Sequence, residues 1–225
     1  MEPKPKDLRL SGSLTHTRGL SMQKPLLVAV TGGSGSGKST IVRKVCESSP
    51  DLLISVIQQD HYYRDLSHLQ PAERDAVNFD HPDSLDMALI RTHMESLASG
   101  NAIDRPSYDF ASHTRMGGTV RMEPKAIIIF DGILALHDPA IRRLFDISVY
   151  VDVPDDVRFI RRLQRDVRER GRSVEGVIEQ YLGSVKPMHD EFVAPVRPMA
   201  DLVICWERWN DRSISMLANA LRAKG

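Results

Sequence analysis

The chain has 225 residues, 41% of them hydrophobic, and its 30 basic side chains balance 30 acidic ones. This length suits one α/β domain with a large core better than two small domains. The even charge argues against a nucleic-acid partner, and no apolar run approaches the roughly 18 residues of a membrane span. Two cysteines, Cys46 and Cys205, lack metal-ligand spacing, so we expect buried thiols in a reducing compartment, the cytoplasm.

The first 24 residues differ in character from the rest of the chain. Residues 1–24 are polar, and they lack the apolar centre of a signal peptide. We expect a disordered leader there and one domain over residues 25–225. The apolar run Leu26 to Val30 then predicts a strand that is buried on both faces of a parallel sheet.

A glycine-rich segment follows this strand and fills every fixed position of the P-loop pattern G-x-x-x-x-G-K-[ST]. Glycines let backbone N–H groups approach a polyphosphate, and a helix that begins near Lys38 turns its positive end toward the anion. Lys38 is expected to reach the β- and γ-phosphates, and the Ser39 hydroxyl to bind Mg²⁺. A flexible Gly/Ser-rich turn would not explain the lysine, the hydroxyl and both flanking elements. The predicted cradle comprises Gly32, Gly33, Ser34, Gly35, Ser36, Gly37, Lys38, Ser39 and Thr40.

The second predicted strand, residues 52–57, leads directly to an acidic residue. In doubly wound sheets ligands bind beyond the carboxyl ends of the strands, so Asp60 is placed on the same rim as the P-loop. It is our candidate for the base that takes a proton from an acceptor hydroxyl. From position alone, Asp60 is equally well interpreted as a turn residue at a strand end. The tyrosines that follow, Tyr62 and Tyr63, are expected to wall a substrate pocket.

A helix is predicted to start at Asp83 or Ser84 and to end at Gly100. Asp83 is then the favoured cap, which leaves Asp80 free to hold vicinal hydroxyls.

Residues 101–123 predict a β-hairpin outside the main sheet. Its strands are expected over residues 103–110 and 119–122, joined through residues 115–118. A histidine at a position like that of His113 is usually an ordinary loop residue. With Tyr108 and Phe110 nearby to stack, it becomes a candidate donor to a base carbonyl.

Three further apolar runs complete the predicted sheet, over residues 126–130, 147–151 and 202–206. Asp131, at the end of the first of them, can lie beside a metal ion at the P-loop. Helices are expected over residues 138–145 and 213–223. Because strands alternate with helices, the sequence predicts an α/β sandwich with a central parallel five-stranded sheet.

Two helices, over residues 154–170 and 174–192, are predicted to form a lid, with a kink at Pro187 in the second. We expect Val157, Ile160 and Val167 to share the apolar face of the first. Its arginines allow two interpretations: a solvated face neutralised by neighbouring acids, or guanidinium groups that close over a triphosphate. These arginines are Arg158, Arg161, Arg162, Arg165, Arg168, Arg170 and Arg172, and the acids are Asp155, Asp156, Asp166 and Glu169.

Taken together, these motifs resemble those of the uridine–cytidine kinase family of P-loop kinases, over about residues 26–220. The resemblance is carried by segments 32–40, 59–64, 78–83, 108–115, 130–134, 161–172 and 180–187. It implies transfer of the γ-phosphate of ATP or GTP to the 5′-hydroxyl of uridine or cytidine, with Mg²⁺ as cofactor. The implied partners are therefore a small-molecule nucleoside and nucleotide, and family members are commonly homotetramers.

The resemblance also implies roles for individual side chains. Asp60 would be the base, Asp80 would hold the ribose hydroxyls, and Arg162 would help to place the sugar. The metal would lie at Ser39 and Asp131. The nucleoside pocket would comprise Tyr63, Tyr108, Phe110, His113, Ile133 and Gln180, and the donor phosphates would contact Arg165 and Arg170.

Two departures from the family pattern stand out. Asp131 replaces the usual glutamate, so we expect a water between this shorter carboxylate and Mg²⁺. His61 and Tyr62 replace serine and phenylalanine, which is expected to alter the shape of the pocket.

Two alternative functions stay open at this point. One is a P-loop kinase for phosphoribulose or pantothenate, although a phosphosugar would call for extra basic residues in the hairpin. The other is a nucleotide-dependent switch. It is disfavoured because the chain lacks an N-K-x-D element for guanine and because a catalytic base such as Asp60 has no obvious role in a switch.

Overall fold

The computed structural model describes residues 24–224, so the predicted leader lies outside the described residues apart from Lys24. The main strands are β1 (Leu26–Thr31), β2 (Ile54–Gln58), β5 (Ile127–Asp131), β6 (Ile147–Asp152) and β7 (Leu202–Cys205). A separate hairpin comprises β3 (Ile103–Asp109) and β4 (Thr114–Met122). The α-helices are α1 (Lys38–Ser48), α2 (Pro71–Asp75), α3 (Met87–Ala98), α4 (Pro139–Arg142), α5 (Asp155–Arg170), α6 (Val174–Gln180), α7 (Lys186–Met188) and α8 (Asp211–Lys224).

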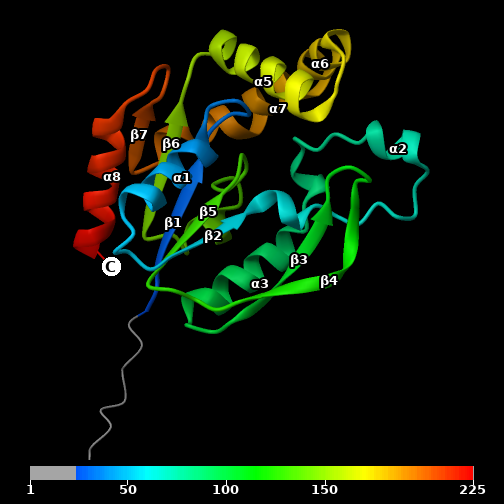
Figure 1. Ribbon diagram of the computed structural model, residues 1–225. Coiled ribbons are helices and arrows are strands. Elements are labelled where there is room, and N and C mark those ends of the chain that lie inside the picture. The colour runs from blue at the N-terminus through cyan, green and yellow to red at the C-terminus, as the bar shows by residue number, and fades with distance from the viewer. Residues whose placement is uncertain (1–23, 225) are drawn as a thin grey trace, which may run out of the picture.

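The five main strands form one parallel sheet in the order β2-β5-β1-β6-β7, which confirms the predicted fold class. Asp131 pairs with Val30 on one side and with Gln58 on the other. Three strands therefore end at one level, and the P-loop, Asp131 and the segment after Gln58 share one rim. Helices α5, α6 and α7 lie beyond this rim, and the hairpin extends to one side with α3 (Figure 1).

Alternate side chains of the central strands pack into two separate hydrophobic cores. Leu27 and Phe130 face a cluster that includes Met94 of α3, whereas Val28 and Ile129 face a cluster with α1 and α8. Both faces of β1 and β5 are thus covered, which explains their continuous apolar runs. This double burial makes the rim a rigid platform.

Helix α3 begins later than predicted. Its cap is Asp86, whose side chain accepts a hydrogen bond from the Leu89 N–H at 3.1 Å, and the helix starts at Met87. Leu85 cannot be helical because it forms an antiparallel bridge with Tyr63. The prediction that Asp83 caps this helix was therefore wrong, whereas Gly100 lies just beyond the helix end with φ +77°, as expected.

The hairpin turns at residues 110–113 and not at the glycine pair that was predicted to form the turn. The Asp109 carboxylate accepts hydrogen bonds from the Ala111 N–H (2.9 Å) and the Ser112 hydroxyl (2.7 Å), a side-chain-stabilised turn. His113 completes it with φ +55°. Gly117 and Gly118 instead lie inside β4.

The lid helices also differ from the prediction. Helix α5 buries Arg158, Arg162 and Asp166, one on each successive turn, while Ile160 is 51% exposed. This helix packs on the polar P-loop, so charged residues face inward. Val157 packs against the core as expected, but Ile160 does not share its face. The second helix is interrupted by π-helical turns at Tyr181–Val185 and His189–Val193, which flank α7.

Two smaller expectations can also be compared with the structure. Cys46 is only half-buried and Cys205 is exposed, so neither is the buried thiol that we expected. Across residues 24–224, no helix combines the length and the apolar character that a membrane crossing requires.

A core substitution far from the rim tests the packing. Leu221 of α8 is fully buried, so Leu221→Ala should lower the free energy of unfolding by about 2–5 kcal/mol, measured by urea denaturation. Met216→Ala on the same helix is the control, because Met216 is 72% exposed and its loss should change stability by less than about 0.5 kcal/mol. Equal effects of the two changes would contradict the assigned packing.

Candidate active site

The P-loop joins the end of β1 to the start of α1. Gly37 caps α1 with φ +90°, and a Cβ at this position would lie 2.8 Å from the Trp206 indole. Only glycine meets both conditions. The Lys38 side chain is buried and donates from Nζ to the Gly33 carbonyl at 3.1 Å. The loop is therefore held in shape, with the N-terminus of α1 directed at its centre.

Ser39 and Asp131 meet beside this loop. The Ser39 hydroxyl donates to one Asp131 carboxylate oxygen at 2.6 Å, and the other oxygen, Oδ1, is buried without a hydrogen-bond partner. A hydroxyl and a carboxylate are oxygen ligands of the kind that Mg²⁺ prefers, and the unpaired oxygen offers a free ligand position. The residues present therefore fit a magnesium ion. Within residues 24–224, no group of three or more His, Cys, Asp or Glu is placed to hold a metal by itself.

A lysine and three carboxylates share the floor of the site. Burial lowers the pKa of Lys38, opposed by the charges of Asp131 and Asp60. Burial raises the pKa of Asp60, and the Asp131 charge raises it further. Asp60 itself is exposed to solvent, so the rise in its pKa reflects the protein packed around the carboxylate and the nearby Asp131 charge. The pKa values of Asp80 and Asp131 are also raised, chiefly by burial. These mutual effects show that the predicted acids lie together.

The segment after β2 holds Asp60 in place. It forms a 3₁₀ turn, Gln59–Tyr62, directly beyond the strand. The Gln59 side chain is buried, and its Oε1 accepts a hydrogen bond from the Leu134 N–H at 2.9 Å. This contact ties the Asp60 turn to the loop that follows Asp131.

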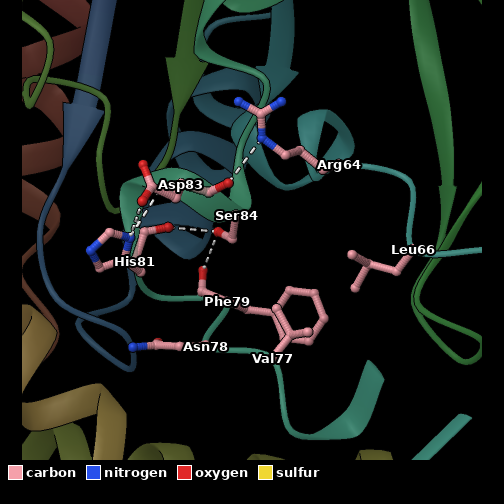
Figure 2. Close-up of a pocket in the computed structure, with 8 residues that line it drawn as sticks. All are labelled: Arg64, Leu66, Val77, Asn78, Phe79, His81, Asp83 and Ser84. Atoms are coloured by element: carbon pink, nitrogen blue, oxygen red, sulfur yellow. Dashed lines mark hydrogen bonds and ion pairs between the residues drawn. The ribbon is translucent and has the colours of Figure 1, made fainter. Parts of the chain in front are cut away.

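Hydrogen bonds among residues 79–84 and from Arg64 brace the loop that carries Asp80, and Figure 2 shows these bonds. The Ser84 hydroxyl donates to the carbonyls of Phe79 (3.2 Å) and His81 (2.7 Å), and Arg64 Nε donates to the Asp83 carbonyl at 2.9 Å. A cavity of about 270 Å³ opens beside this loop, and it contains none of the predicted site residues. It adjoins the aromatic group through Phe79, whose ring contacts Tyr63 and His113. Its lining residues are Arg64, Leu66, Val77, Asn78, Phe79, His81, Asp83 and Ser84.

Aromatic side chains from three segments form a continuous group next to the acids. The centroid of the Tyr63 ring lies 5.1 Å from that of Phe79 and 5.4 Å from that of Tyr108. The His113 ring stacks on Phe79 with a centroid distance of 4.5 Å. Burial lowers the pKa of His113, so its imidazole is neutral near pH 7. The hairpin thus brings a neutral donor and flat rings to the same side as Asp60 and Asp80.

Arg162 connects the lid to the P-loop. It is buried, donates to the Ser34 hydroxyl at 2.7 Å and donates to the Gln180 amide oxygen at 2.9 Å. Arg165 and Arg170 extend from the same helix and pair with Asp166 at 2.8 and 3.4 Å. The predicted lid residues Arg165, Arg170 and Gln180 are thus linked to the cradle through Asp166 and Arg162.

Other predicted residues lie further from this centre. Phe110 is 49% exposed and contacts His61 and Tyr108 at the outer end of the hairpin. Ile133 is half-buried in the loop after Asp131. Tyr62 does not wall a pocket: it is buried in the core, and its hydroxyl pairs with His93 Nδ1 at 3.0 Å. Its replacement of phenylalanine therefore affects the core.

Sequence reasoning missed several residues of this site. Phe79 joins the aromatic group, Gln59 fixes the Asp60 turn, and Trp206 packs against Gly37. Asp166 was interpreted only as a neutraliser of the arginines. The one sequence feature that could have identified Asp166 is its position among the arginines. Trp206 follows β7 and belongs to no recognisable sequence motif.

Comparison with known proteins agrees with this geometry. The model of the Phosphoribulokinase / Uridine kinase family matches residues 27–214. The chain is 49% identical to a uridine kinase from Clostridium perfringens (strain SM101 / Type A) over 183 residues, which cover 81% of this chain and 88% of that protein. A uridine kinase from Lactobacillus helveticus (strain DPC 4571) is 44% identical over 203 residues, covering 90% and 96%.

Solved structures support the fold. D-glycerate 3-kinase from Cryptococcus neoformans matches with a TM-score of 0.55 and 18% identity, covering 75% of this chain and 79% of that one. Phosphoribulokinase from Rhodobacter spheroides matches with a TM-score of 0.54 and 14% identity, covering 75% and 68%. With a P-loop, a matching family model over most of the chain and relatives near 50% identity, the chain belongs to the phosphoribulokinase/uridine kinase family.

Proposed function

We propose that the protein is a nucleoside kinase that transfers the γ-phosphate of ATP or GTP to the 5′-hydroxyl of uridine, and of cytidine as well. The observation that carries the proposal is the position of Asp60, close to Lys38 of the P-loop and to Tyr63 of the aromatic group. Relatives with the name uridine kinase agree with it. The homotetramer and the cytoplasmic location stay predictions.

The acceptor half would use the residues on the hairpin side of the rim. Asp80 would accept hydrogen bonds from the ribose hydroxyls, with Arg162 close enough to Asp80 to act on its charge. Tyr63 and Tyr108 would line the pyrimidine pocket with Phe79, and His113 would donate to a base carbonyl. A rigid aromatic wall of this kind fits a flat base better than a phosphorylated sugar, which has no ring face to stack.

Asp60 would act as general base. The acceptor oxygen attacks the γ-phosphorus, its proton passes to the Asp60 carboxylate, and the bond to the β-phosphate oxygen breaks. Partial desolvation and the Asp131 charge both raise the pKa of this carboxyl, which makes it a stronger base than an aspartate without these neighbours. Lys38 lies close enough to favour the ionised form that the reaction needs.

The donor half would use the cradle and the lid. Backbone N–H groups of residues 32–40 would surround the phosphates, with Lys38 on the β- and γ-groups and Arg165 and Arg170 closing from above. Mg²⁺ would be held by Ser39 and, directly or through a water, by Asp131. When bound, the ion would neutralise charge on the phosphate oxygens.

A substrate panel tests this function. The purified protein with Mg²⁺-ATP is expected to form ADP in the presence of uridine or cytidine, measured by a coupled spectrophotometric assay. Adenosine and ribulose 5-phosphate serve as comparison acceptors. Absence of pyrimidine-dependent ADP formation would overturn the proposal, and turnover with ribulose 5-phosphate alone would favour the phosphoribulokinase branch.

Asp60→Asn should lower kcat by about 10²–10⁴-fold, because the acceptor proton loses its base. Donor binding should persist. It can be followed by intrinsic fluorescence, because both tryptophans of the chain, Trp206 and Trp209, lie next to the P-loop or α1. Near-normal turnover would exclude Asp60 as base.

His113→Asn should raise the KM for uridine and leave the KM for ATP nearly unchanged. Asparagine tolerates the positive φ of this turn, so the hairpin should persist while the ring is lost. His68→Asn, at an exposed position, is the matched control. An equal rise of both KM values would show that His113 supports the fold and does not contact the nucleoside.

A further inference from the structure

One buried carboxylate lies at the centre of the lid arginines. Asp166 of α5 is fully buried, and its two oxygens meet guanidinium nitrogens of four arginines. The closest is Arg165 Nε, which donates to Oδ1 at 2.8 Å. The others are Arg170 at 3.4 Å, Arg162 at 3.5 Å and Arg172 at 3.7 Å.

The backbone brings these arginines to the same carboxylate. Arg162 and Arg170 lie one turn before and one turn after Asp166, on the same face of the helix. Gly171 then ends the helix in the left-handed conformation, φ +65°, and donates its N–H to the Asp166 carbonyl. The Arg172 N–H binds this carbonyl too, at 3.1 Å. Asp166 therefore organises the turn with its main chain and the guanidinium groups with its side chain.

The cluster carries far more positive than negative charge. Its four guanidinium groups repel one another: Arg165 and Arg172 both lower the pKa of Arg162 and of Arg170, although burial lowers these two values most. The pKa of Asp166 is lowered despite its burial, because Arg165, Arg162 and Arg170 surround it. One ionised carboxylate thus lies within ion-pair distance of four cations, and it accepts a hydrogen bond from Arg165.

This cluster is joined to the donor site and to the next helix. Arg162 reaches the P-loop through Ser34, and its second nitrogen donates to Gln180 of α6. Arg172 donates to the same Gln180 oxygen at 2.7 Å. A change at Asp166 therefore reaches both the P-loop and α6.

We propose that Asp166 is a positioning residue that preforms the donor-phosphate site by holding Arg165, Arg170 and Arg172 in one array, joined to the P-loop through Arg162, before nucleotide binds. One carboxylate neutralises only part of the positive charge of the array, so the remainder can bind a polyphosphate. A single α-phosphate would contact only part of the array. The proposal rests on the proposed donor site, but it concerns nucleotide binding and does not depend on which acceptor the enzyme uses. Without the carboxylate, the half-exposed Arg170 and Arg172 would turn toward solvent, and nucleotide would have to order them.

The test compares Asp166→Asn, which keeps the size of the side chain, with Glu169→Gln, an exposed position on the same helix. Tryptophan fluorescence follows binding of Mg²⁺-ATP and of AMP. Asp166→Asn should weaken ATP binding by about tenfold or more and lower kcat, while AMP binding stays within about twofold. Glu169→Gln should leave ATP and AMP binding unchanged.

Unchanged ATP binding, or equal losses for ATP and AMP, would overturn the proposal, since a merely structural role has no reason to distinguish the two nucleotides. Because binding is measured without an acceptor, failure of the nucleoside assay would leave this result intact. If Asp166→Asn does not fold, NMR of the wild-type protein decides. The Arg165 Nε–H should exchange with water more slowly than that of exposed Arg168 in the nucleotide-free protein, and equally fast exchange would contradict a preformed array.

Discussion

The buried charge of Lys38 is the constraint on which the rest of the site depends. An ammonium group withdrawn from water needs polar partners: Lys38 donates to the Gly33 carbonyl at 3.1 Å, and the charges of Asp131 and Asp60 favour its ionised form from a longer distance. Their own pKa values are raised, so this balance is costly in the free protein. A donor polyphosphate would supply further anionic partners for Lys38 and for the lid arginines. Donor binding and catalysis thus draw on the same electrostatic arrangement.

The sheet makes this arrangement possible. Asp131 pairs with Val30 and Gln58, so three parallel strands end at one level and deliver the P-loop, the metal-side carboxylate and the Asp60 turn together. These features could be predicted from the sequence because each is local: an apolar run, a glycine-rich motif, and an acid directly after a strand. For the same reason the five strands and the α/β class were predicted correctly.

The features that sequence reasoning missed arise from contacts between distant segments. Helix α3 begins at Met87 because Leu85 is paired with Tyr63, a partner more than 20 residues away. Helix α5 turns charges inward because it packs on the P-loop, which no periodicity within residues 154–170 reveals. In the hairpin, two segments could have formed the turn: the glycine pair and the residues after Asp109. The turn forms after Asp109, because its carboxylate accepts hydrogen bonds from Ala111 and Ser112. Helix and strand patterns therefore predicted the scaffold, whereas the orientation of the lid and hairpin required tertiary structure.

The central claim is that this rim aligns the γ-phosphate with the 5′-hydroxyl of a pyrimidine nucleoside. Phosphorus NMR of the product from Mg²⁺-ATP and uridine tests it most directly, because the splitting of the phosphoester signal reports how many protons lie on the esterified carbon. The account predicts a triplet from the two 5′-protons, which Asp60→Asn should nearly abolish. A doublet from a 2′- or 3′-phosphate, or release of inorganic phosphate alone, would contradict it.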